Sequence, residues 1–349
     1  MSLSLCLYLN IMKYIRTFLL TISLVFAFVS CGDSMVIDNN PDKNFDALWK
    51  IIDENYCFLD YKEIDWDRVY KEYKQRIKTN MGSDALFTLM GDMLSELKDG
   101  HVNLVASHDM SRYWSWYEDY PTNFDASVHS KYLGKNYSIA SGMKYTIFDD
   151  NVGYIYYSSF TNDVGDGNLT QIISRMSICK GIIIDIRSNG GGTLTNVDKI
   201  AARFLNEKTL VGYITHKVGK GHSDFSSFYP KYVESYNGIR FQKPVVVLTN
   251  RGCYSAANDF VNVMKNAPKA TIIGDKTGGG SGLPFTSELP NGWTVRFSAS
   301  PMYDINKNHI EFGIEPDIRV GMTKEDIDKE IDTIIEKARD FINNSNAVD

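Results

Sequence analysis

The pattern of apolar and polar residues divides the chain into a shorter helical region and a longer region in which strands and helices alternate. In residues 44–55, apolar side chains recur every three or four positions, which is the spacing of an amphipathic helix. The same spacing predicts helices over residues 65–77 and 83–97, the second with Ser83 as its N-cap. We therefore predict a small helical region over residues 43–103.

From residue 104 onward, short β-type runs are bounded by glycine, aspartate and asparagine. Two of these runs, residues 181–187 (GIIIDIR) and 244–250 (PVVVLTN), are almost continuously apolar, and helical segments alternate with them. Such a succession is typical of a sheet that is covered on both faces, so we predict an α/β fold for residues 104–349. The other expected elements are strands at 102–107, 136–141, 144–150, 152–160, 211–218 and 270–275, helices at 168–178, 196–204, 255–265 and 324–342, and a hairpin over 286–301.

The N-terminal residues have the pattern of a secretory signal. A short basic region precedes an apolar run at residues 18–29, which is too short to span a bilayer. A serine and then Cys31 follow this run, and Cys31 resembles the lipid-modified cysteine of bacterial lipoproteins. We predict a lipoprotein-type signal peptide over residues 1–30 and a tether over residues 31–42. The alternatives are a plain signal peptide and a membrane anchor.

The composition excludes several classes of protein. Of 349 residues, 43% are apolar and 23% are charged, and the formal net charge is −6. No basic stripe is interleaved with aromatic residues, so nucleic acid is not an expected partner. After Cys31 only Cys57, Cys179 and Cys253 remain, without the spacing of a metal site. The sequence predicts no disulfide scaffold, no metal and no cofactor.

The first candidate for chemistry lies in residues 249–260 (TNRGCYSAANDF), where a buried strand turns into a helix. Ser255 begins this helix, where unpaired N–H groups and the helix dipole favour a developing negative charge. The N–H of Ala256 would then donate to an oxyanion. The first alternative is that Ser255 is only an N-cap. The second is that Cys253 is the nucleophile, although it lies on the strand side of the turn, away from the helix N-terminus.

Two other segments supply candidate partners for this serine. Three glycines, Gly190 to Gly192, follow the strand at 181–187, and their backbone can approach a ligand closely, as a second oxyanion donor must. His101, in the segment KDGH, follows a helix and precedes a strand, and it is the candidate base. Residues 274–281 (GDKTGGGS) are not a phosphate-binding loop, because Gly280 replaces the lysine that such a loop requires.

Six segments, taken in their order, resemble the C-terminal processing (tail-specific) and tricorn-like serine peptidases, over about residues 44–320. The resemblance implies a crotonase-like core of stacked ββα units. It also implies a nucleophile at Ser255 and oxyanion donors at the N–H groups of Ala256 and Gly191. The segments are LKDGHVNL, GIIIDIRSNGGG, VVVLTNRGCYSAANDF, IIGDKTGGGSG, LPNGWTVRFS and FGIEPDIRV.

The family activates its serine in two ways. The processing peptidases use a lysine, whose place is held here by Gly280. The Ser-Lys dyad is therefore absent, unless Lys276 substitutes from an unmatched position. The tricorn-like branch uses a histidine, matched by His101, and a glutamate near the C-terminal motif orients it. That glutamate is either Glu311 or Glu315. The segment that follows the histidine motif is too short for the PDZ module of the processing peptidases, and we expect its Trp and Tyr side chains to pack between the two regions.

We therefore expect an exported serine peptidase that cleaves peptides or proteins through an acyl-enzyme. It would be held by a lipid at Cys31 in the cell envelope, as a periplasmic or outer-membrane lipoprotein. A histidine base predicts activity that rises through about pH 6–7. The alternative is a non-catalytic ligand-binding or scaffold protein on the same fold, because a fold does not fix a function.

Overall fold

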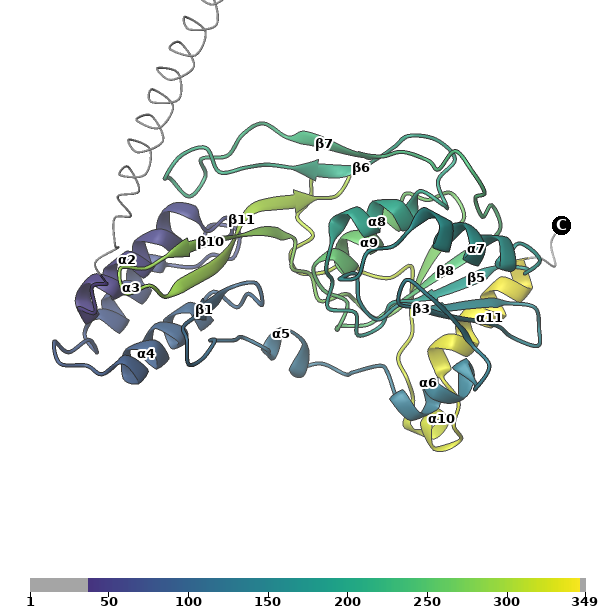
Figure 1. Cartoon of the computed structure of the whole chain (residues 1–349), viewed down its shortest axis with the longest axis horizontal. Coiled ribbons are helices and arrows are strands. Elements are labelled where there is room, and N and C mark those ends of the chain that lie inside the picture. The colour runs from purple at the N-terminus through teal and green to yellow at the C-terminus, as the bar shows by residue number, and fades with distance from the viewer. Residues whose placement is uncertain (1–36, 346–349) are drawn as a thin grey trace, which may run out of the picture. The chain divides into compact units, whose positions relative to one another are not determined.

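A computed structural model describes residues 37–345 (Figure 1). The expected signal peptide, Cys31 and half of the tether lie outside the described residues. Two sheets organise the described chain, and the predicted α/β class is confirmed. None of the helices between residues 37 and 345 combines the length and the apolar character that crossing a bilayer requires.

The larger sheet has seven strands in the order β12-β9-β8-β5-β4-β3-β2. The strands from β4 to β12 pair in parallel, and β2 and β3 add an antiparallel edge. Every residue of β5 and of β8 is buried, as their continuous apolar sequences predict. The strands are β2 (Ser138–Ala140), β3 (Met143–Ile147), β4 (Gly153–Tyr156), β5 (Ile182–Asp185), β8 (Val245–Thr249), β9 (Ala270–Gly274) and β12 (Ile318–Arg319).

Helices cover both faces of this sheet because successive side chains of a strand point to opposite faces. Ile182 and Ile184 of β5 belong to a core with α7 (Asp166–Met176), α8 (Leu194–Ala201) and α9 (Ala256–Met264). Ile183, between them, belongs to a second core with α6 (Ala126–Leu133) and α11 (Thr333–Ser345). Figure 1 shows α8 and α9 on the side of the sheet away from α11.

The smaller sheet has the order β1-β11-β6-β7, and β10 also pairs with β11. The predicted hairpin is present: β10 and β11 pair antiparallel, and the turn lies at residues 289–293. Three N-terminal helices share a core with this hairpin, whose members include Leu289, Val295 and Phe297. The elements are β1 (Asn103–Val105), β6 (Thr209–Ile214), β7 (Tyr229–Val233), β10 (Gly282–Glu288), β11 (Thr294–Tyr303), α2 (Pro41–Asn55), α3 (Trp66–Lys74) and α4 (Ser83–Ser95).

Two details of the predicted helices are wrong. Ser83 is the first residue of α4, and its N-cap is Gly82. The single helix expected over residues 324–342 is two helices, α10 (Lys324–Asp328) and α11. They are separated because Glu330 has φ 62°, and because the buried Asp332 accepts the N–H groups at the start of α11 while it pairs with Arg187.

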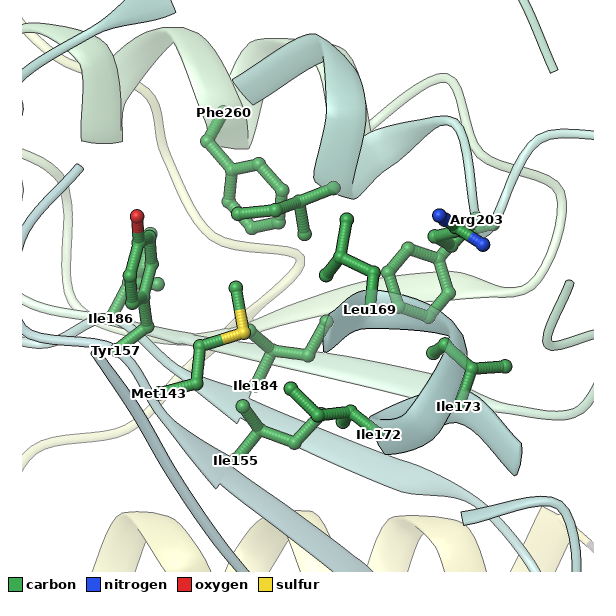
Figure 2. Close-up of a pocket in the computed structure, with 12 residues that line it drawn as sticks. Met143, Ile155, Tyr157, Leu169, Ile172, Ile173, Ile184, Ile186, Arg203 and Phe260 are labelled. Atoms are coloured by element: carbon green, nitrogen blue, oxygen red, sulfur yellow. The ribbon is translucent and has the colours of Figure 1, made fainter. Parts of the chain in front are cut away.

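The core against α7, α8 and α9 contains a small cavity of about 20 Å³ (Figure 2). Met143, Ile155, Ile184, Leu169 and Phe260 are among its lining residues. This volume holds about one water molecule, and most of its lining residues are apolar, with Tyr157 and Arg203 as the exceptions. The cavity is therefore a packing gap of the core and not a ligand site.

Candidate active site

Ser255 lies in the turn between β8 and α9 and has an unusual backbone conformation. Its φ is 58° and its ψ is −121°, a region that residues with a Cβ rarely adopt. Hydrogen bonds on both sides hold this conformation: the N–H of Ser255 donates to Gly279 O at 2.8 Å, and the carbonyl accepts from Asp259 N at 3.0 Å. Backbone strain of this kind is typical of functional sites, and a sharp strand-to-helix turn is how some hydrolases expose a nucleophile.

Ser255 occupies the N-cap position of α9, as the first alternative expected, but its hydroxyl caps no N–H group of the helix. Cys253 is excluded as the nucleophile. Its side chain is fully buried, its S–H donates to Ile186 O at 3.0 Å, and burial raises the pKa of the thiol to about 12. A thiolate does not form there at neutral pH. Cys57 and Cys179 are buried free cysteines as well.

The predicted oxyanion residues lie next to Ser255. Ala256 is the first residue of α9, so its N–H has no acceptor within the helix. Gly191 has φ 98°, and a Cβ at this position would lie 2.8 Å from both Ala256 N and Ser255 Cβ. Only glycine permits this approach. The N–H of Gly191, however, donates to Asn189 Oδ1 at 2.9 Å, so its role as a second donor stays a prediction that requires this bond to open.

His101 is buried close to the turn that contains Ser255. Its ring centroid lies 4.9 Å from that of Tyr254, the residue before Ser255, and its Nδ1 has no hydrogen-bond partner among the described residues. No hydrogen bond joins its ring to Ser255 within residues 37–345. Burial lowers the pKa of His101 to about 4 despite the attraction of Asp99, so the ring is neutral at pH 7 and able to accept a proton.

Asp99 is a buried carboxylate that connects several segments of the site. Its Oδ1 accepts the N–H of His101 at 2.8 Å and the hydroxyl of Tyr254 at 3.2 Å. Its Oδ2 accepts the hydroxyls of Tyr56 and Ser298. Burial acts to raise the pKa of Asp99, but the charges of neighbouring cations and these hydrogen bonds outweigh it and lower the pKa to about 2. Asp99 is therefore charged and holds His101 and Tyr254 together.

The two candidate glutamates do not contact His101 in the described chain. Glu311 is buried, and its Oε1 lies 2.8 Å from Lys62 Nζ, while its Oε2 accepts the N–H of Ser281 at 2.7 Å. Burial raises the pKa of Glu311. Glu315 lies at the surface, where it pairs with Arg319 and with Lys276.

Lys62 is a member of this site that sequence reasoning missed. Only 5% of its side chain is exposed, and its Nζ lies 3.7 Å from Asp99 Oδ2 as well as close to Glu311. The lysine lies between α2 and α3 in a polar segment, YKEID, that resembles any surface loop. No local signal marks it, because both of its partners are distant in the sequence.

The lysine of the processing peptidases has no counterpart here, for a steric reason. Gly280 has φ 75°, and a Cβ at this position would lie 2.3 Å from the Tyr254 ring. The ring of Tyr254 therefore occupies the space that a side chain at residue 280 would need. Lys276 interacts with Glu315, at 3.4 Å, and no contact joins it to Ser255 in the described residues.

No group of three or more metal-ligating side chains occurs between residues 37 and 345.

Comparisons with known proteins show which family the chain is similar to. The model of peptidase family S41 matches residues 151–320, and that of the tricorn protease C1 domain matches residues 38–95. The carboxy-terminal-processing protease of Bartonella bacilliformis is 27% identical over 184 residues, which are 51% of this chain and 40% of that protein. The match thus spans less than half the length of this curated relative.

Solved structures cover more of the chain. The crystal structure of a candidate peptidase from Parabacteroides merdae is 54% identical, with a TM-score of 0.84, and the alignment covers 87% of this chain and 97% of that one. Mature CPAF in complex with lactacystin has a TM-score of 0.67 at 12% identity, covering 87% of this chain and 99% of that one. At that identity the second likeness concerns the fold alone.

Proposed function

Because this chain belongs to peptidase family S41, we propose that it is a serine peptidase with Ser255 as nucleophile and His101 as general base. The backbone of Ser255 is the observation that carries this proposal. The residue has φ 58° where glycine would be less strained, and its hydroxyl caps nothing. A side chain that costs stability and makes no structural hydrogen bond is retained for its chemistry.

The reaction follows from the neighbours of Ser255. His101 accepts the hydroxyl proton as Ser255 Oγ forms a bond to the substrate carbonyl carbon, and the N–H of Ala256 donates to the oxyanion. The C–N bond then breaks, and His101 returns the proton to the leaving amine. Water, deprotonated by the same histidine, attacks the acyl ester and releases the carboxylic acid and the free serine.

Buried charged residues fix the positions of the segments that carry His101 and Ser255. Asp99 accepts hydrogen bonds from the backbone of His101 and from the hydroxyl of Tyr254. Glu311 accepts the N–H of Ser281, and the carbonyl of Gly279, two residues earlier, accepts the N–H of Ser255. Lys62 lies between the two carboxylates. We assign Glu311 to the catalytic group as a positioning residue that acts through Lys62 and Asp99. Glu315, at the surface, lacks such a connection.

The ring of His101 must approach Ser255 Oγ when substrate binds. Catalytic hydrogen bonds are often long or poorly aligned before the substrate is present, so the free arrangement is compatible with this role. The unpaired Nδ1 favours such a movement, because no hydrogen bond to that atom has to break for the ring to turn.

We extend the proposal to the core and to the location of the protein. The parallel strands β4, β5, β8 and β9, with α7, α8 and α9 against one face, support a crotonase-like core. The basic and apolar pattern before Cys31 supports export and a lipid anchor at that cysteine, with periplasmic or outer-membrane placement. Peptides or proteins of the cell envelope are the substrates that such a placement offers.

A fluorophosphonate probe tests the assignment directly. The intact protein should be labelled at Ser255, as shown by peptide mass spectrometry, and Ser255→Ala should abolish both labelling and peptide hydrolysis. His101→Ala should slow both, while Lys276→Ala should leave them unchanged. Labelling that survives in Ser255→Ala would contradict the assignment.

A ligand-binding protein is the second candidate, and one observation favours it. No hydrogen bond connects Ser255, His101 and Glu311 with one another in the described chain. A wild-type protein that is inert toward fluorophosphonates and toward all peptides, and yet is folded, would support this function instead.

A further inference from the structure

A hollow of about 340 Å³ lies beside the nucleophile turn. Trp116, Tyr117 and Pro121 of the aromatic segment line it from one region of the sequence, and Gly190 and Gly252 line it from two loops of the core. Its volume is within the range of about 300–1,000 Å³ that is usual for ligand sites. The cavity of Figure 2, at about 20 Å³, is far too small for a ligand.

Two of the lining residues adjoin the neighbours of Ser255. The indole of Trp116 stacks on the ring of Tyr254, with centroids 4.0 Å apart and an angle of 27° between the planes. Gly190 precedes Gly191, which borders Ser255 Cβ. A substrate carbonyl at Ser255 carries its own side chain a few ångströms away. The hollow is therefore placed to receive a side chain next to the scissile bond.

Several polar groups of the lining are already engaged, while the indole N–H of Trp116 is buried without a hydrogen-bond partner among the described residues. Ser188 N donates to Asn250 Oδ1 at 2.7 Å, and Asn250 Nδ2 donates to Ser188 Oγ at 3.1 Å and to Thr122 O at 2.7 Å. These groups have little remaining capacity for a polar ligand. An apolar side chain of the substrate could enter the hollow without breaking the hydrogen bonds of Ser188 and Asn250.

Charge further narrows the choice of ligand. Arg251 is the one charged residue among the described residues that line the hollow. Its Nε donates to Trp116 O at 2.5 Å and its Nη1 to Thr277 O at 3.1 Å. A substrate lysine or arginine would meet this like charge, and the carboxylate of Glu118 does not line the hollow but accepts the hydroxyl of Tyr117 at 3.3 Å. Aromatic walls and a fixed cation thus favour an uncharged side chain.

We propose that this hollow is a specificity subsite for a large apolar or aromatic side chain of the substrate residue that supplies the scissile carbonyl. The proposal rests on the peptidase activity proposed above and adds the class of side chain that it selects. The aromatic segment, expected from sequence to pack between two regions, does stack on Tyr254, and it also lines the subsite.

Gly190 permits a sharp test. A Cβ at this position would have no atom within 4 Å, so a side chain here enters open space instead of clashing. Gly190→Val should narrow the subsite while the fold is kept. Trp116→Ala should widen it and remove an aromatic wall. Trp114→Ala is the matched control, because Trp114 is the same residue type on the same segment and does not line the hollow.

The experiment compares kcat/KM for fluorogenic peptides that differ only in the residue that supplies the scissile carbonyl: Phe, Leu, Ala or Lys. The wild type should prefer Phe over Ala by about tenfold to a hundredfold, because burial of the larger side chain is favourable, and it should reject Lys. Gly190→Val should lower the Phe-to-Ala ratio by about tenfold and Trp116→Ala by a similar factor. Trp114→Ala should keep the wild-type ratio.

The outcomes separate the two proposals. Ser255-dependent cleavage with a Phe-to-Ala ratio that neither Gly190→Val nor Trp116→Ala changes would overturn the subsite and leave the peptidase intact. A wild-type preference for Lys would do the same. Absence of any Ser255-dependent cleavage or fluorophosphonate labelling in the wild type would overturn the peptidase proposal, and the subsite with it.

Discussion

Lys62 and Glu311 form a buried ion pair, with 2.8 Å between Nζ and Oε1 and only 5% and 4% of their side chains exposed. The same ammonium lies 3.7 Å from Asp99, so one cation compensates two buried carboxylates. Asp99 holds the segment of His101, and Glu311 holds the loop whose Gly279 carbonyl accepts from Ser255. The pair therefore connects the segment of His101 with the loop that binds Ser255.

Lys62→Met should destabilise the protein by about 3–5 kcal/mol, because it leaves buried carboxylates without their cation. The double variant Lys62→Met/Glu311→Gln should be less destabilised than Lys62→Met alone, since the amide needs no counter-charge. Urea unfolding of the wild type, the single variants and the double variant measures this coupling.

Lys329→Met is the matched control, because Lys329 pairs with Glu325 at the surface and should contribute little. Additive losses in the Lys62/Glu311 cycle would mean that the pair is not coupled. A Lys62→Met protein as stable as the wild type would remove the basis for its positioning role.

Gly280→Ala should destabilise the protein strongly and abolish activity, because the added Cβ would lie 2.3 Å from the ring of Tyr254 at a φ of 75°. Gly280→Lys should be no better, although it restores the family's lysine. Gly167→Ala is the control, since Gly167 lies in α7 with no atom within 4 Å of its Cβ. Melting curves and peptidase assays on the three variants check this, and an active Gly280→Lys protein would contradict it.

The sequence predicted those elements whose pattern reflects local burial. Strands β5 and β8 and the β10–β11 hairpin are continuous or alternating apolar runs, and each was found near its expected place. The break between α10 and α11 was missed, because helical periodicity continues across it. Asp332 interrupts the helix to reach Arg187, 145 residues earlier, and no local pattern contains that contact.

The active site shows the same limit. Ser255, Gly191 and His101 were proposed from motifs. The structure places Gly191 against Ser255, and it places His101 in contact with Tyr254, the residue before the serine. Lys62 was not identified, because its importance arises only from burial between two carboxylates. The pKa of His101 could not be inferred either. A motif shows which residue is present, but not how deeply it is buried.

The pH dependence of activity should differ from that expected of an ordinary histidine. Burial lowers the pKa of His101 to about 4, with Arg296 and Lys62 acting in the same direction and Asp99 opposing them. A general base works when deprotonated, so kcat/KM should rise with pH through about 4 and be level by pH 6–7, where the sequence alone had predicted the rise. A pH–rate profile with its acidic limb at 6–7 would contradict this burial.

The free energy of unfolding should also rise with pH. Between about pH 4 and 6.5 the unfolded chain binds more protons at His101 than the folded one, so stability falls as pH decreases through this interval. Burial also lowers the pKa of His309 to about 4, so His309 adds to the same dependence of stability on pH. His101→Ala should therefore reduce the acid sensitivity of unfolding only in part, and a measurement of unfolding free energy at pH 4.5 and 7 distinguishes its share.

The lipid anchor is tested by Cys31→Ser. If Cys31 carries lipid, the wild type should fractionate with membranes and partition into detergent, and the serine variant should be released, because a hydroxyl cannot replace the thiol at that modification. Cys57→Ser is the control, since Cys57 is a buried free cysteine of the core. A Cys31→Ser protein that stays on the membrane would show that the apolar run of residues 18–29 anchors the chain.

The strained backbone of Ser255 gives the sharpest prediction about its role. At φ 58° and ψ −121°, a residue with a Cβ is strained, and this strain lowers the stability of the protein. Glycine adopts this conformation with less strain. Ser255→Gly should therefore stabilise the protein by about 1 kcal/mol while reducing turnover by about a thousandfold or more. Ser255→Ala should lose the same activity with little change in stability, because the hydroxyl caps no N–H group.

Ser141→Gly is the matched control for this trade of stability against activity. Ser141 also has a positive φ, 49°, but it lies in the turn between β2 and β3, outside the site. The hydroxyl of Ser141 accepts the N–H of Gly165 at 3.4 Å, so Ser141→Gly should gain less stability than Ser255→Gly. Ser141→Gly should keep full activity, whereas Ser255→Gly loses it. Denaturant unfolding and kcat/KM on the three glycine and alanine variants decide the matter. If Ser255→Gly were less stable than Ser255→Ala, the strain would not be present in solution, and the strongest support for Ser255 as the nucleophile would be lost.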